Sequence, residues 1–77
     1  MSSVDFNDTY IMDRKDIVLK LAQIRQSKDI SAYELSLRVD KAHNYIHSIE
    51  SGKINPSLDS LLAICNELGI HPRELFN

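Results

Sequence analysis

The stretch SAYELSLRVDKAHNYIHSIESGK, from Ser31 to Lys53, decides the fold. It opens with a serine that is followed three residues later by Glu34. This is the pattern of a capping box, which predicts that a helix begins there. "VDKA", residues 39–42, then interrupts the helical pattern. A second helix is expected over about 42–51, because its isoleucines share one face at helical spacing. Two short helices separated by a few residues are typical of a helix-turn-helix.

Helical patterns continue on both sides of this stretch. Residues 13 to about 27 carry apolar side chains at spacings of three and four, which predicts a preceding helix. After "NPS", Ser57 is in position to cap a leucine-rich helix that Gly69 ends. In "HPREL", His71 takes the cap position and Pro72 the first position of a last helical turn or two.

The chain is expected to be one small domain. It has 77 residues, 43% of them apolar, and only two glycines and two prolines, which excludes a fibrous or disordered composition. We predict an all-α fold of five short helices over residues 13–77. Residues 1–12 show no helical period or cap and are expected to form a flexible N-terminal tail.

The charge is unevenly distributed along the chain. The net charge of −2 divides into −2 over residues 1–12, +2 over residues 13–53 and −2 over residues 54–77. A mildly basic middle between acidic ends is a weak electrostatic footprint for a nucleic-acid partner.

Several classes of protein are not expected. The single cysteine, Cys65, cannot form an internal disulfide and fits a reducing cytoplasm. No apolar run approaches the roughly 20 residues that span a membrane. The sequence has no glycine-rich phosphate loop and no enzyme constellation, so we expect no catalytic residues, cofactor or small-molecule effector.

Taken together, the motifs resemble a known family. Arg25, "S..EL" from Ser31, "YI..IE.GK..PS" from Tyr45 and "LGI.P.ELF" from Leu68 occur in the order and spacing of lambda-repressor-like (Cro/C1, Xre-type) helix-turn-helix regulators. The resemblance covers about residues 17–76. It implies a sequence-specific, DNA-binding transcriptional regulator of bacteria or phages, with the helix at about 42–51 in the major groove.

The resemblance also implies where the site lies. The positions nearest bases or backbone are those of His43, Asn44, Tyr45 and Ser48, with His47 on the flank. The resemblance places Ala32 beside a phosphate at the start of the preceding helix, and Lys53 and Asn55 near phosphates after the reading helix at about 42–51. We also expect Ser31 to help hold a phosphate. Tyr33 could brace a phosphate, and simple placement on the surface is the alternative. Arg25 and Glu50 fall where the family often places a partly buried ion pair.

Two of these side chains suit base recognition by their chemistry. The amide of Asn44 can pair with N7 and the N6 amine of adenine, and Tyr45 could pack on a thymine methyl or bond a phosphate. Simple placement of Asn44 on the helix surface, and packing of Tyr45 against the previous helix, remain the alternatives.

His43 and His47 raise the question of a metal site. Placed four apart on one helix face, they would have a zinc-ligand spacing. Two more ligands would be needed, but Glu50 is expected to pair with Arg25 and Cys65 to face the core. We therefore expect no metal. A surface that faces DNA or a partner is the main interpretation, and a solvated helix face without function is the alternative.

A homodimer that binds two half-sites about 34 Å apart is the expected assembly. Its predicted surface is the apolar C-terminal end around Ile70, Leu75 and Phe76. The alternative function is a protein-interaction module that keeps the fold but does not bind DNA. It is favoured by Ala32, which replaces a frequent glutamine, and by the lack of arginine and glutamine in the reading helix.

Overall fold

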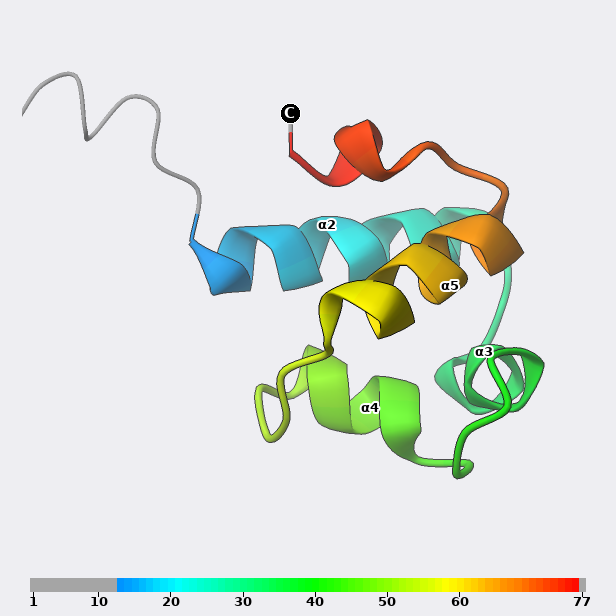
Figure 1. The fold of residues 1–77 in the computed structure, drawn as a ribbon. Helices are drawn as coiled ribbons and strands as arrows, with labels where there is room; N and C mark the ends of the chain where they lie inside the picture. The colour runs from blue at the N-terminus through cyan, green and yellow to red at the C-terminus, as the bar shows by residue number, and fades with distance from the viewer. Residues whose placement is uncertain (1–12, 77) are drawn as a thin grey trace, which may run out of the picture.

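A computed structural model describes residues 13–76 (Figure 1). Its helices are α2 (Arg14–Ser27), α3 (Ala32–Arg38), α4 (Tyr45–Glu50), α5 (Leu58–Leu68) and the 3-10 helix η1 (Pro72–Leu75). No strand occurs in this part of the chain, and the all-α prediction is confirmed. The predicted count of five helices is not exact, because the described residues form four α-helices and one turn of 3-10 helix. The tail predicted over residues 1–12 lies outside the described residues.

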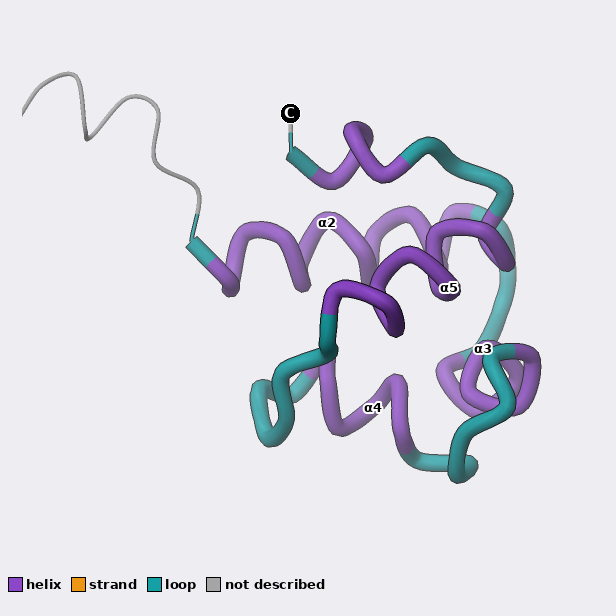
Figure 2. Tube along the Cα trace, in the orientation of Figure 1, coloured by secondary structure: helices purple, strands orange, loops and turns teal. Residues whose placement is uncertain are grey.

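The helices stack around the middle of the molecule. In Figure 1, η1 lies on one side of α2, and α3 and α4 lie on the other. α4 packs against both α3 and α2, α5 packs against α3, and η1 packs against α2. Figure 2 shows that the helices are joined by short loops, the longest of which lies between α4 and α5.

Local signals in the sequence set most helix ends. Asp13 and Asp16 form a reciprocal capping box at the start of α2. Ser57 accepts a hydrogen bond from the Ser60 N–H at the start of α5, and Gly69 ends that helix with a left-handed φ of 70°. These features fix α2 and α5 at the boundaries that the sequence predicts.

The capping box predicted at Ser31 is only half formed. The Ser31 hydroxyl accepts a hydrogen bond from the Glu34 N–H at 2.9 Å, as expected for a cap. The carboxylate of Glu34 instead forms an ion pair with Arg38, one turn further along the same helix. An exposed arginine at that spacing therefore competes with the backbone for the glutamate.

The core gathers apolar side chains from every helix. Its buried members, each at most 3% exposed, are Leu21, Leu35, Ile46, Ile49, Ile64, Cys65, Leu68 and Leu75. The burial of Leu75 seals the end of the core, because η1 turns back onto α2. Across residues 13–76, no helix is both long and apolar enough to cross a membrane.

Candidate nucleic-acid interface

The helix expected over about 42–51 is shorter than predicted. α4 begins at Tyr45, and His43 and Asn44 belong to the turn before it. Ala42 has no side-chain oxygen with which to cap a helix, and its carbonyl instead accepts the Tyr45 N–H at 3.0 Å. The prediction that His43 and His47 share one helix face is therefore wrong.

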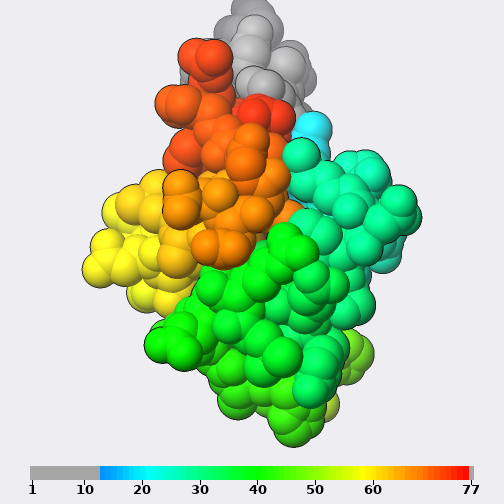
Figure 3. Space-filling view, turned by 90° about the vertical axis from the view of Figure 1, so that its right-hand side faces the viewer, coloured from blue at the N-terminus to red at the C-terminus, as the bar shows by residue number. Residues whose placement is uncertain are grey.

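The turn before α4 uses a left-handed residue. Asp40 has a φ of +62°, a left-handed conformation that aspartate adopts more readily than most residues. The Lys41 N–H then bonds to the Ser36 carbonyl at 3.0 Å. Figure 3 shows the green atoms of this turn at the surface, between the blue-green atoms of α3 and the yellow and orange atoms of α5.

The residues expected to face bases are accessible. His43, Asn44 and His47 are exposed, and Tyr45 and Ser48 are half-buried. Asn44 occupies the N-cap position of α4, but its side chain makes no capping hydrogen bond. Its amide therefore keeps its donors and its acceptor for a partner.

Two contacts that the sequence did not predict order the aromatic side chains. The rings of Tyr33 and His43 lie 6.1 Å apart between centroids, which brings the start of α3 next to the turn before α4. The ammonium group of Lys41 lies 5.4 Å from the centroid of the Tyr45 ring, a cation–π distance. Neither contact could be read from sequence spacing, because each depends on the path of the turn.

The candidates for phosphate contacts fall into two groups. Ser31 and Tyr33 are exposed at the start of α3, whereas Ala32 is half-buried and packs against the core. The Ser31 hydroxyl accepts the Glu34 N–H, so its own proton stays available to donate. Lys53 and Asn55 are exposed in the connection after α4.

Arg25 and Glu50 tie the end of α4 to α2. The Arg25 Nε and Nη2 donate to the two carboxylate oxygens of Glu50 at 2.7 and 3.0 Å. The Arg25 Nη1 also donates to the Ile30 carbonyl at 2.7 Å. Their side chains are only 11% and 15% exposed. The fork geometry makes this a strong, oriented contact.

Ser36 forms contacts beside the candidate site that the sequence does not predict. Among the described residues it is the one polar side chain that is fully buried. Its hydroxyl donates to the Ala32 carbonyl at 2.7 Å and accepts the Ile46 N–H at 2.9 Å. No signal in a single sequence reveals such a contact, because a serine inside a helix usually faces solvent.

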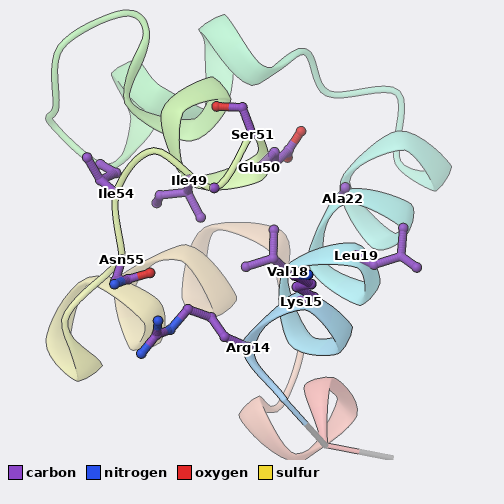
Figure 4. A pocket seen from close by; sticks show the side chains of 11 residues that line it. Arg14, Lys15, Val18, Leu19, Ala22, Ile49, Glu50, Ser51, Ile54 and Asn55 are labelled. Atoms are coloured by element: carbon purple, nitrogen blue, oxygen red, sulfur yellow. The ribbon is translucent and has the colours of Figure 1, made fainter.

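A surface groove of about 330 Å³ lies beside the connection after α4 (Figure 4). Val18 and Leu19 of α2 line one side, and Ile49 and Ile54 line the other. Of the predicted site residues, Asn55 and Glu50 border it. Within residues 13–76, no cluster of three or more histidine, cysteine, aspartate or glutamate side chains could hold a metal ion.

The Cys65 thiol belongs to the core. Burial, and then the negative charge of Glu74, raise its pKa. The thiol therefore stays protonated near neutral pH, and a protonated thiol is a poor nucleophile and metal ligand.

The chain is similar in sequence to a known protein family and to two known proteins. The sequence profile of the helix-turn-helix family matches residues 21–75. The chain is 39% identical over 59 residues to the control protein C.BamHI of Bacillus amyloliquefaciens, covering 75% of this chain and 73% of the relative. It is 41% identical over 59 residues to the control protein C.MunI of a Mycoplasma species, covering 75% of this chain and 80% of that protein.

A solved structure is similar over nearly its whole length. The restriction-modification controller protein C.AhdI of Aeromonas hydrophila superposes with a TM-score of 0.76 and 31% identity. The match covers 83% of this chain and 97% of that one.

Proposed function

We propose that the start of α4 reads bases in the major groove. The premise is that this chain belongs to the helix-turn-helix family of DNA-binding transcriptional regulators. A major groove about 12 Å wide accepts one helix. α4 has six residues and is therefore about 9 Å long. So short a helix reaches the bases mainly through its first turn and the turn before it.

Asn44 carries this proposal. It is exposed at the N-terminal end of α4, and its amide is not used for capping. An asparagine amide can bond adenine N6 and N7 together, a pairing that distinguishes adenine from the other bases. Tyr45, Ser48, His43 and His47 would contact neighbouring bases or the groove edge.

Phosphate contacts would come from residues on both sides of the start of α4. Ser31 and Tyr33 at the start of α3 and Lys53 and Asn55 after α4 are exposed donors. Ala32, which is half-buried and has no polar side-chain atom, would offer only its backbone amide. Such contacts position a protein on DNA without reading its sequence.

The genes under control are proposed from the relatives. Two of them are control proteins, and the solved one is a restriction-modification controller protein. We propose that this chain likewise regulates the genes of a restriction-modification system. It would act in the cytoplasm, where that DNA lies, and without catalysing a reaction.

A homodimer is part of the proposal, with a corrected surface. Leu75 is fully buried, so it cannot form the contact expected of it. Phe76, Leu58 and Leu62 are apolar and 51%, 69% and 42% exposed, and the two leucines share one face of α5. A second copy covering these side chains would remove apolar surface from water. Light scattering of Leu58→Lys, compared with the natural chain, tests this surface.

Selection of bound sequences from random DNA tests the function. The natural chain should enrich one sequence, and Asn44→Ala should lose the preference at an adenine within it. Affinity should fall steeply with rising salt, because each phosphate contact releases counterions. No enrichment at low salt, together with binding to a protein partner, would favour the interaction-module alternative.

A further inference from the structure

We infer that the Ser36 hydroxyl positions the start of α4 and thereby sets how selectively this protein distinguishes its DNA site from other DNA. The effect on DNA selectivity rests on the proposed function. The hydrogen bond between Ser36 and Ile46 can be tested without DNA.

α4 lacks the means to hold its own N-terminal end. A helix of six residues is far below the roughly 12 residues at which isolated helices become marginally stable. Its first turn leaves backbone N–H groups without helical partners. Asn44, in the N-cap position, does not accept any of them through its side chain.

Ser36 supplies the missing acceptor from another helix. The Ser36 Oγ lies 2.9 Å from the Ile46 nitrogen, in a position from which solvent is fully excluded. The same hydroxyl donates to the Ala32 carbonyl at 2.7 Å, so the oxygen cannot rotate away without losing a second bond. A relay of two hydrogen bonds therefore joins α3 to the second residue of α4.

The two ends of α4 are thus tied to different helices. Ser36 holds the N-terminal end to α3, and the ion pair of Glu50 with Arg25 holds the C-terminal end to α2. Asn44 lies two residues from the Ile46 amide, so the first tie is the one nearest to the base-reading position. Loss of the Ser36 hydrogen bond should therefore reduce selectivity for the DNA site more than it reduces affinity through phosphate contacts.

The central experiment compares Ser36→Ala with the natural chain. In Ser36→Ala, the Ile46 amide should exchange its hydrogen about tenfold faster than global unfolding of that variant alone would produce. This factor is in line with the loss of one partner by a buried donor. Affinity for the selected DNA site should fall about tenfold, while affinity for random duplex DNA should change less than about twofold.

Two further variants separate positioning from stability. Ile64→Val removes a methylene from a buried residue of α5 and lowers stability while leaving both hydrogen bonds of Ser36 in place. It should leave the ratio of specific to random affinity unchanged at temperatures where the protein is folded. Ser36→Cys keeps the shape of the side chain with a slightly larger atom and offers a weak acceptor, so it should give an intermediate loss even if Ser36→Ala does not fold.

The outcomes distinguish the inference from the function on which it rests. Unchanged exchange of the Ile46 amide in both Ser36 variants would overturn the tie. Faster exchange with an unchanged affinity ratio would overturn the positioning role and leave Ser36 a structural residue. If the natural chain itself prefers no DNA sequence, the proposed function fails, and the exchange measurement still decides whether the tie exists.

Discussion

α5 and α4 are held in place in opposite ways. α5 has 11 residues, begins at its own serine cap and ends at a left-handed glycine. α4 has six residues, no side-chain cap, and polar ties to Ser36 and Arg25 on other helices. The ends of α5 are thus set by residues of its own segment, whereas the ends of α4 depend on residues up to 25 positions away.

The first prediction removes the tie at the C-terminal end of α4. Arg25→Ala should lower the free energy of unfolding by about 3 kcal/mol, because it leaves a largely buried carboxylate without its partner. Urea denaturation measures this loss. Arg38→Ala is the matched control: its pair with Glu34 is exposed and lies within one helix, so its loss should be about 0.5 kcal/mol or less. Equal losses would mean that the Arg25 pair is no stronger than a surface pair.

The second prediction concerns the free amide at the start of α4. Asn44→Ala should weaken binding to the selected DNA site by about 1–3 kcal/mol, the value of one good bidentate base contact. Because Asn44 makes no side-chain capping bond, the melting temperature should hardly move. Fluorescence anisotropy with labelled DNA and a thermal melt together test this. A large drop in melting temperature would show that Asn44 supports the fold instead.

The third prediction tests the local cap of α5. Ser57→Ala should lower the free energy of unfolding by about 1 kcal/mol, as the loss of an N-cap does. DNA affinity should be unchanged, because Ser57 is not part of the proposed interface. With Asn44→Ala, this variant forms a crossed pair in which one change affects stability and the other affects binding. If both variants affect both properties, the contrast between the two helices is incorrect.

The fourth and smallest effect concerns the core end of α5. Burial raises the pKa of the Cys65 thiol above its usual range, so the folded state favours the protonated form. The stability this provides is complete below the pKa of the unfolded thiol and is lost as pH rises through the folded value. Between pH 8 and 10, urea denaturation should show a steeper loss for the natural chain than for Cys65→Ala. Parallel curves would contradict the shift.

The same contrast explains what the sequence could predict. The ends of α2 and α5 follow from caps, glycine and helical spacing, and the sequence predicts both. The start of α4 was misplaced by three residues, because its acceptor is a serine ten positions away in another helix. Capping motifs concern residues that are close in sequence, so they cannot predict a cap that comes from a different helix.

The interface divides in a similar way. Exposure of His43, Asn44 and His47 agrees with the surface that the family resemblance implies, while their roles toward DNA stay predictions. The approach of Tyr33 to His43 and the relay through Ser36 exist only because α3 and α4 pack together. The pair of Arg25 and Glu50 was expected from the resemblance and is present, although nothing in local spacing relates two residues in different helices.

Asn44 leaves the capping of α4 to another helix, and this has a consequence for how such a protein can change. Because Asn44 is exposed and its side chain takes no part in capping, substitutions there should alter the preferred DNA sequence with little effect on folding. A new operator preference could then arise in single steps, each of which leaves a folded protein. Because Ser36 and Arg25 hold α4 in place, the exposed residues at its start are free to evolve, or to be redesigned.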